Sequence, residues 1–331
     1  MCIMEKGKNE KTGEWTEMKA LSYLKKFALD PRMRFYYFSR LGLLNGMSDA
    51  DYLRRQFRLW MGTELDLEDP KGYNEKLQWL KVYDHRPEYS IMVDKYAVKQ
   101  WVADRIGEQY LIPTLGVWDH FDQIDFDALP RQFVLKCTHD SGSIFFVKDK
   151  SAMNRKEMKR KLEGCLRQKW YRSYREWAYK DVKPRIIAET YMTDESGTEL
   201  KDYKVFNFDG VPRLIQVDYD RFTEHKRNLY TTDWQYLPVR IIYPTDPGHP
   251  IARPECLEKM LDLAHRLSEG YPHLRTDFYC IRDRVYFGEL TFYHESGMAQ
   301  FDPPSFDLEM GSWLKLPDRR EREKETQEGT V

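Results

Sequence analysis

Apolar side chains recur at helical spacing in several parts of the chain. The clearest stretch is "DKYAVKQWVADRIGEQYL", residues 94–111, whose apolar positions share one face and predict a helix that ends near Gly107. Those positions are Tyr96, Val98, Trp101, Val102 and Ile106. Two helices are predicted within residues 18–60, the second with Ser48 or Asp49 as its N-cap. Shorter or more basic helical stretches follow at residues 73–84, 151–177 and 253–270.

Other stretches have the composition and alternation of strands. Strands are predicted within residues 111–119, on both sides of a polar loop in residues 133–147, and in residues 185–192 and 200–220. Asp209-Gly210 is a tight-turn signal between two of them. Residues 274–292, "LRTDFYCIRDRVYFGELTF", predict a hairpin that turns at Arg282-Asp283. Helices mixed with hairpins in this way indicate an α+β fold.

Composition narrows the class of protein. The chain has 331 residues, 41% of them hydrophobic, with 32% charged residues and a net charge of -1. This length suggests two or three structural units, and the balanced charge argues against nucleic acid as the main partner. The five cysteines are scattered, so neither a zinc site nor a disulfide framework is indicated, and a reducing cytoplasm is expected. No signal peptide is expected, and no run approaches the ~18 apolar residues of a transmembrane helix.

Four regions are predicted. Residues 1–47 are predicted to form an N-terminal helical extension, and residues 48–135 a region that precedes the catalytic one. Residues 136–316 are predicted to form the catalytic region, and residues 317–331 a disordered charged tail. The extension is basic and aromatic, which leaves two uses open. It packs against the body of the protein, or it makes a peripheral contact with the inner face of a membrane.

The predicted hairpin of residues 274–292 carries three charged residues on its strands. Arg275 and Asp277 share one strand face, and a three-residue turn would place Asp277 opposite Glu289 on a face that also includes Val285, Phe287 and Thr291. Facing carboxylates repel each other, but a divalent cation between them would remove the repulsion. On this interpretation an amide in place of either acid would barely lower, or even raise, stability without metal. The alternative is that the acids face water.

A second candidate lies in "FVLKCTHDSGSIFFV", residues 133–147. Lys136 ends a buried strand, and a small polar loop with Ser141, Gly142 and Ser143 follows it. Backbone N–H groups of such a loop can hold phosphate oxygens while the lysine neutralises charge. An ordinary strand–turn–strand unit is the alternative.

A third candidate is an adenine pocket. An apolar strand runs into Glu189, which with the adjoining backbone at Tyr191 and Met192 would meet the edge of the base. Asp202 and Lys204 share one face of the next strand and would complete that pocket. The alternative is a hairpin with charges facing the solvent.

The order of these pieces resembles the ATP-grasp superfamily, and D-alanine–D-alanine ligases in particular. It runs from Asp94-Lys95 through Lys136 and its loop, Glu189, and Asp202 with Lys204, to R-x-D at residues 275–277 and E-x-T at residues 289–291. The flanking segments "NEKLQWLKVYD", "DKYAVKQWV", "FVLK", "DYKVF" and "FGELTF" are similar to the TupA-like ATP-grasp family, named after a teichuronopeptide biosynthesis protein and found in bacterial cell-surface polysaccharide gene clusters. The resemblance covers about residues 48–316.

The resemblance implies a fold of two α/β subdomains that clasp ATP. It implies that Lys95 and Lys136 hold ATP phosphates, and that Asp277, Glu289 and Thr291 hold Mg²⁺. Thr291 replaces the family's asparagine, and its hydroxyl is also a neutral oxygen ligand; His294 and Glu295 are alternatives. Catalytic roles fall to Arg275, Lys204 and Arg227.

The implied reaction is ligation of a carboxylate to an amine, with ATP as the activating substrate. The substrates would be an amino acid, a uronic acid sugar, or both, in a cell-surface polysaccharide such as a capsule, and His225, Lys226 and Arg227 would meet an anionic substrate or form a solvated face. A glycosyltransferase is the alternative, because "DFD" at residues 125–127 and "DYD" at residues 218–220 fit the D-x-D pattern of such enzymes. The oligomeric state is not readable from the sequence.

Overall fold

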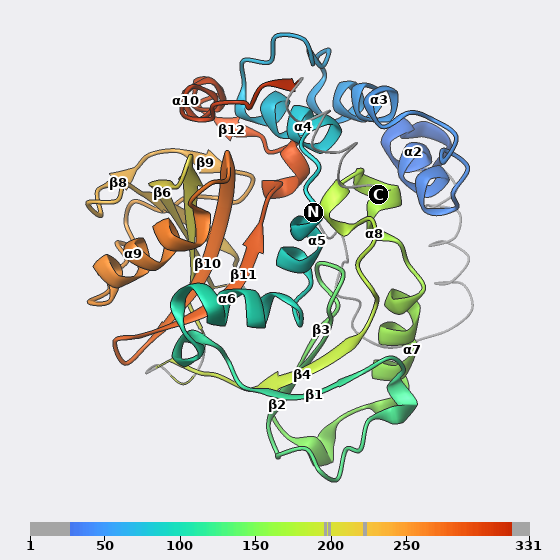
Figure 1. Cartoon of the computed structure of the whole chain (residues 1–331), viewed down its shortest axis with the longest axis vertical. Coiled ribbons are helices and arrows are strands. Elements are labelled where there is room, and N and C mark those ends of the chain that lie inside the picture. The colour runs from blue at the N-terminus through green and yellow to red at the C-terminus, as the bar shows by residue number, and fades with distance from the viewer. Residues whose placement is uncertain (1–26, 195–196, 198–199, 221–223, 320–331) are drawn as a thin grey trace.

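The computed structural model describes residues 27–194, 197, 200–220 and 224–319 (Figure 1). Its α-helices are α2 (Pro31–Arg40), α3 (Asp49–Met61), α4 (Tyr73–Tyr83), α5 (Glu88–Val93), α6 (Val98–Ile106), α7 (Arg155–Leu166), α8 (Trp170–Tyr174), α9 (Leu257–Ser268) and α10 (Ser305–Trp313). Helices and antiparallel sheets together confirm the predicted α+β class.

Two sheets form the frame, and all their strand pairs are antiparallel. The smaller sheet has the order β1-β4-β2-β3, from β1 (Thr114–Trp118), β2 (Phe133–Cys137), β3 (Ile144–Val147) and β4 (Ile186–Thr190). The larger sheet has the order β11-β10-β5-β6-β7-β8. Its strands are β5 (Asp202–Phe208), β6 (Val211–Tyr219), β7 (Lys226–Tyr230), β8 (Tyr236–Leu237), β10 (His273–Ile281) and β11 (Arg284–Thr291). A short pair joins β9 (Arg240–Ile241) to β12 (Phe301–Asp302).

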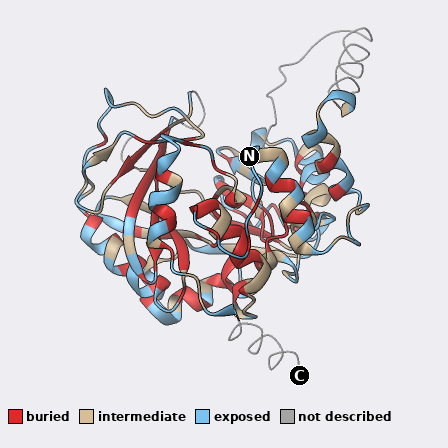
Figure 2. Ribbon diagram, turned by 90° about the horizontal axis from the view of Figure 1, so that it is seen from above, coloured by how far each residue is buried: buried red, intermediate tan, exposed pale blue. Residues whose placement is uncertain are grey.

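Each sheet has its own hydrophobic core. Helix α9 packs on β5, β6 and β10 of the larger sheet, and α7 packs on β2 of the smaller one. Figure 2 shows the buried residues gathered on the strands and on the helix faces turned toward them. The face of the larger sheet opposite α9 carries a row of polar side chains, which is where the candidate chemistry lies.

The hairpin of β10 and β11 differs from the prediction in its turn. Arg282 and Asp283 form a two-residue turn with φ of 47° and 61°, instead of a three-residue loop. A β-bulge at Gly288 inserts the missing residue, so Asp277 still lies opposite Glu289. The bulge also reverses the alternation: Val285 and Phe287 are buried in the core and do not share the face of Glu289.

The predicted helices are mostly present but shorter. Ser48 caps α3 by accepting from the N–H of Asp51, as predicted. Helix α6 begins only at Val98, and Tyr96 is exposed outside it, so the prediction of a buried Tyr96 was wrong. The basic stretch 151–177 is divided into α7 and α8. The tight turn at Asp209-Gly210 is confirmed between β5 and β6.

The N-terminal extension is only partly described, because residues 1–26 lie outside the described residues. In α2, Phe35 and Ser39 are buried against α3, while Tyr37 and Phe38 are exposed, as are Leu41 and Leu43 just beyond the helix. Packing against the body is therefore confirmed for one face of this helix. Among the described residues, no helix combines the length and apolarity that crossing a membrane requires. Of the predicted charged tail, residues 320–331 also fall outside the description.

A disulfide joins Cys256, just before α9, to Cys280 near the end of β10. Sequence analysis did not predict it, because residues 24 positions apart meet only through the packing of α9 on the sheet. Cys137 and Cys165 are free thiols.

Candidate active site

The smaller sheet brings two predicted residues together and adds a third. Lys136 on β2 and Glu189 on β4 are neighbours across the strand pair, and Lys136 Nζ lies 2.6 Å from Glu189 Oε2. Lys99 of α6 reaches the other oxygen at 2.5 Å. Burial opposes ionisation of Glu189, but Lys136 and Lys99 outweigh burial and hold the pKa of Glu189 below its ordinary value. Lys99 was not predicted as a site residue, although it lies only four residues after Lys95 in the sequence.

Hydrogen bonds among its own residues fix the conformation of the loop after β2. The hydroxyl of Ser143 contacts Asp140 and accepts from the N–H of Cys137 at 3.1 Å, and Gly142 has a φ of 101°. Lys95 Nζ contacts the carbonyl of Asp140, and the N–H of Lys95 donates to the carbonyl of Thr138 at 3.1 Å. The structure therefore places Lys95 against the loop that contains Ser141, Gly142 and Ser143. Ser141 and Gly142 are exposed and accessible to a ligand.

On the larger sheet, cross-strand pairing makes a continuous polar row. Gln216 of β6, Lys204 of β5, Asp277 of β10 and Glu289 of β11 lie directly opposite one another in register. Lys204 contacts Asp202 and lies 2.6 Å from Asp277 Oδ2. Burial lowers the pKa of Lys204, but Asp202 and Asp277 more than compensate, so that its pKa is raised and the ammonium stays charged.

Arg275 contacts both acids of this row. Its Nε and Nη2 donate to the two oxygens of Asp277 at 2.7 Å each, and Nη2 also lies 3.2 Å from Glu289 Oε1. Asp277 is 1% exposed, whereas the Glu289 side chain is 44% exposed. Thr291 is paired with Arg275 across the strands, so its hydroxyl belongs to the same face.

These oxygens fit Mg²⁺, which takes one or two protein carboxylates and completes its shell with phosphate and water. Asp277 and Glu289 are the two carboxylates, and Thr291 adds a neutral oxygen. Within the described residues no group of three or more His, Cys, Asp or Glu could hold a metal by itself. His294 and Glu295 do not join the acids, because His294 faces Arg275 and Glu295 faces Arg227.

Lys95 acts electrostatically on an acid of the larger sheet. Burial raises the pKa of Glu289, but Arg275, Lys204 and Lys95 outweigh it and lower the pKa overall. Arg275 and Lys204 belong to the larger sheet, whereas Lys95 contacts the loop after β2. A cation beside that loop therefore contributes to the charge balance of the polar row.

Arg227 lies at the other end of the polar face. Its Nε donates to Asp218 at 2.7 Å, its Nη1 lies 3.3 Å from Glu295, and its guanidinium stacks over Tyr243. Arg227 is 3% exposed, so it is not part of a solvated face. His225 lies 3.3 Å from Asp218, whereas Lys226 points away and pairs with Asp246.

The two D-x-D triplets have structural roles. Asp125 accepts from the N–H groups of Asp127 and Ala128 and forms a turn. Asp218 is buried against Arg227, and burial is outweighed by Arg227 and His225, which hold its pKa well below the usual range.

Tyr191 and Met192 directly follow β4 and are partly exposed. The ring of Tyr191 meets Phe146 of β3 edge to face, at 6.5 Å between centroids. Phe146 and Ile144 are exposed apolar side chains on an edge strand, which gives the predicted adenine region an apolar wall. Glu189 is held by two lysines in this structure, so its contact with adenine stays a prediction.

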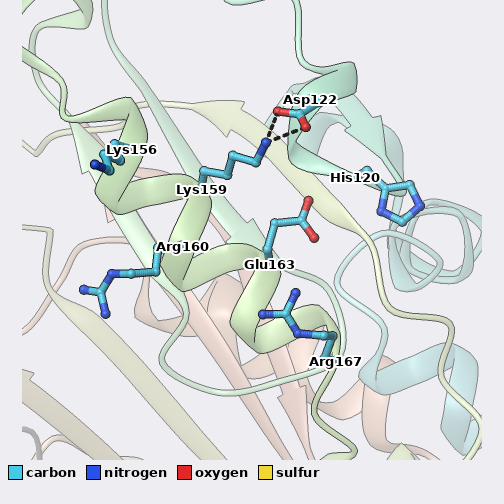
Figure 3. Close-up of a pocket in the computed structure, with 7 residues that line it drawn as sticks. All are labelled: His120, Asp122, Lys156, Lys159, Arg160, Glu163 and Arg167. Carbon is cyan, nitrogen blue, oxygen red and sulfur yellow. Dashed lines mark hydrogen bonds and ion pairs between the residues drawn. The ribbon is translucent and has the colours of Figure 1, made fainter.

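A surface hollow of about 610 Å³ lies elsewhere. Figure 3 shows that α7 lines it with Lys156, Lys159, Arg160 and Glu163, and that Lys159 turns away from α7 to bind Asp122. None of the predicted site residues lines it. It is a charged surface outside the candidate active site.

Solved structures with related chain paths are remote in sequence. A D-alanine–D-alanine ligase from Bacillus anthracis with ATP is 15% identical, with a TM-score of 0.36 over 61% of this chain and 54% of that one. The Helicobacter pylori D-alanine–D-alanine ligase is 14% identical, with a TM-score of 0.39 over 69% and 60%. The D-cycloserine synthetase DcsG is 17% identical, with a TM-score of 0.37 over 69% and 72%.

The chain thus spans a little over half the length of the first of these ligases. No curated protein matches it. A family model described as TupA-like ATPgrasp matches residues 75–315, which is most of the chain and includes both sheets. The chain belongs to the TupA-like ATPgrasp family.

Proposed function

We propose that the protein is an ATP-dependent ligase that activates a carboxylate as an acyl phosphate and joins it to an amine. The observation that carries this proposal is the polar face of the larger sheet. Two acids suited to Mg²⁺ lie beside Lys204 and Arg275 there, and Lys95, which contacts the loop after β2, acts electrostatically on Glu289. Lys136 on the smaller sheet and Lys99 on α6 are further cations, both paired with Glu189.

Phosphoryl transfer needs charge neutralisation and alignment more than covalent help. Asp277, Glu289 and Thr291 would hold Mg²⁺, which when bound would neutralise charge on the phosphate oxygens. Lys95, Lys136 and the N–H groups of residues 141–143 would hold the phosphates, and Tyr191, Met192 and Glu189 would border the adenine. Asp202 would keep Lys204 charged and in place beside the γ-phosphate.

In the first step a substrate carboxylate oxygen attacks the γ-phosphorus, and the bond from phosphorus to the bridging oxygen breaks, so that ADP leaves with the electron pair. In the second step the amine nitrogen attacks the acyl carbon, the bond from that carbon to the phosphate oxygen breaks, and the amine gives a proton to water. Arg275 would stabilise the charge that develops in both steps, because its planar fork is already fixed by Asp277.

The substrates proposed from the family resemblance are an amino acid, a uronic acid sugar, or both, used for a cell-surface polysaccharide such as a teichuronopeptide or capsule. The enzyme would act in the cytoplasm. The exposed apolar side chains around α2 support a peripheral contact with the inner face of the membrane. Arg227, buried with Asp218 and Glu295, is proposed to help position the substrate.

The choice of nucleotide tests the proposal first. Calorimetry should show that Mg·ATP binds more tightly than UDP-sugars, which a glycosyltransferase would prefer. Tight binding of a UDP-sugar without any response to ATP would reject the ligase and favour the alternative.

The intermediate tests the reaction itself. With Mg·ATP, hydroxylamine and a panel of amino acids and uronic acids, an acyl phosphate would be trapped as a hydroxamate while ADP is released. ATP consumption without any carboxylate dependence would contradict the proposal.

A further inference from the structure

The turn that follows β11 has an unusual backbone. In η5 (His294–Gly297), the residues Glu295, Ser296 and Gly297 have φ of 47°, 56° and 63° in succession. Left-handed conformations cost non-glycine residues about 1–3 kcal/mol each, and they persist only where the surroundings fix them. Contacts from neighbouring residues must therefore stabilise this turn, and a functional role beside the polar row would account for its cost.

The support comes from one face of α4. Asn74, Gln78 and Lys81 are spaced by four and three residues, so their side chains lie along one stripe of the helix. Gln78 Nε2 donates to the carbonyls of Ser296 and Gly297 at 2.9 and 2.7 Å. Lys81 Nζ donates to the carbonyl and hydroxyl of Ser296 at 2.8 Å each.

Asn74 completes this support. Its Nδ2 donates to the carbonyl of Ala299 at 2.9 Å, and its Oδ1 accepts from the N–H of Ala299 at 3.0 Å. All three side chains are buried, and in Figure 1 α4 lies beside the segment that follows β11. The helix thus fixes the turn through its backbone and leaves the side chains of His294 and Glu295 directed toward the polar face.

A contact with Arg275 fixes the tautomer of His294. Arg275 Nη1 lies 2.8 Å from His294 Nδ1, and a guanidinium can only donate, so Nδ1 accepts and the proton is on Nε2. His294 is fully buried, and burial together with Arg275 and Arg227 holds its pKa well below the usual range, so it is neutral. The Nε2–H is buried and finds no hydrogen-bond partner in the described part of the chain.

The surroundings indicate what this donor would bind. His294 lies near Arg275, Arg227 and Lys204, each of which is already paired with acids. Its ring packs on Phe206 at 4.8 Å between centroids, and Phe206 is two residues from Lys204, on the same strand face. A fixed, uncharged donor suits a carboxylate or carbonyl oxygen, because an unmet buried donor costs about 1–3 kcal/mol until an acceptor arrives.

We infer that His294 donates its Nε2–H to an acyl oxygen of the carboxylate substrate, and that Asn74, Gln78 and Lys81 are positioning residues that hold it there. The inference rests on the proposed ligase function and adds to it the residue that binds the acyl group of the substrate. Its role is to fix the carboxylate for attack on the γ-phosphate and to stabilise the oxyanion when the amine adds.

Two substitutions separate this role from simple support of Arg275. His294→Asn keeps a polar atom near the Nδ1 position and lacks the ε donor. His294→Gln places an N–H near the Nε2 position and lacks the δ acceptor. If the donor matters, Asn should lower kcat for hydroxamate formation by about 100-fold or more, as loss of an oxyanion donor does, while Gln retains more activity. The Kd for Mg·ATP should stay within about twofold in both. The reverse order, with Asn active and Gln inactive, would overturn the inference.

A second measurement does not depend on turnover. In protein labelled with ¹⁵N-histidine, with His294→Asn used for assignment, the His294 resonances should show a neutral ring protonated at Nε2. Addition of acetate with Mg·ADP should shift the His294 Nε2–H signal and leave that of His273 unchanged, because both ring nitrogens of His273 are already paired. An Nδ1–H tautomer, or no shift at His294, would reject the donor role even if the ligase reaction is confirmed. The expected shift would support it even if no carboxylate in the panel is turned over.

Discussion

At the scale of single residues, the site depends on buried charges that share counterions. Asp277 accepts from Arg275 through both oxygens and from Lys204, while Glu289 has one longer contact and a partly exposed side chain. The facing acids therefore do not simply repel each other in the absence of metal. We therefore expect the sequence-based prediction, that either amide would barely lower or even raise stability without metal, to hold for Glu289 but not for Asp277.

We predict that Asp277→Asn and Glu289→Gln both abolish Mg²⁺-dependent turnover but differ in stability. Removal of Asp277 leaves two buried cations short of a counterion, which typically costs about 3–5 kcal/mol. Glu289→Gln should cost about 0–1 kcal/mol, because the Glu289 side chain is 44% exposed and has one longer contact. Urea unfolding without metal measures both, and equal losses would show that the two acids are equivalent.

We also predict a loss of stability in acid that originates in a buried histidine. His273 donates from Nδ1 to the carbonyl of Asn207 and accepts from the hydroxyl of Tyr73, and burial lowers its pKa to about 3. Below the unfolded value of about 6.5, the unfolded state binds a proton that the folded state refuses, so stability falls as pH decreases. The slope is about 1.4 kcal/mol per pH unit, or about 2 kcal/mol by pH 5.

The comparison protein for this prediction is His273→Gln, which cannot take up that proton. The free energy of unfolding of this variant should be lower at pH 7. Between pH 6.5 and 4.5 it should fall less steeply with pH than that of the unmodified protein, by the slope that corresponds to about one proton. Parallel curves from urea titrations would show that His273 does not carry the effect.

At the scale of elements, α4 shows how a helix outside the two sheets serves the site. Its apolar side chains, including Tyr73, Leu77 and Leu80, pack into the core, and its polar stripe holds η5. The spacing of Asn74, Gln78 and Lys81 was visible in the sequence, but their partners were not. The partners in the segment after β11 are backbone carbonyls more than 200 residues away in the sequence. The periodicity of a sequence does not reveal contacts over such separations.

Lys81→Met should therefore lower kcat by about 10-fold or more and leave Mg·ATP affinity nearly unchanged, since small displacements of a positioned group are costly. The matched control is Lys76→Met on the same helix. Lys76 also donates to two carbonyls, those of Gly311 and Leu314, but these belong to the end of α10 rather than to η5. Equal loss of kcat in the two variants would show a general effect of α4 and contradict a specific hold on the turn.

The elements that the sequence predicted well are those whose signals are local. Period-two strands, the Ser48 cap and the Asp209-Gly210 turn follow from neighbouring residues and are present. The opposition of Asp277 and Glu289 was predicted correctly for a wrong reason, because the extra residue lies in the bulge at Gly288 and not in the turn. Lys99 was missed, and His294 was considered only as an alternative metal ligand, because the contacts of each residue are made with a distant element.

At the scale of the whole molecule, the candidate site is shared between two sheets with separate cores. Lys136 belongs to the smaller sheet, and Lys204, Arg275 and the two acids belong to the larger one. Lys99 reaches Glu189 of the smaller sheet from α6, whose buried residues belong to the larger core. A ligand that contacts both sides stabilises the folded state by its binding free energy. Mg·ATP at 1,000 times its Kd should therefore add about 4 kcal/mol to the free energy of unfolding.

We predict that Lys136→Met reduces this stabilisation without unfolding the protein. Glu189 keeps Lys99 as its counterion, so the smaller sheet retains a paired carboxylate, while one of the cations proposed to hold ATP phosphates is lost. At the same ATP concentration, a tenfold weaker Kd would lower the added stability by about 1.4 kcal/mol. Thermal unfolding with and without Mg·ATP measures the difference in both proteins. An unchanged response to ATP in Lys136→Met would remove Lys136 from the phosphate site. The control is Arg131→Met, which loses an exposed ion pair with Asp149, a residue just after β3. An equal loss of the response in that variant would indicate a general effect of charge instead.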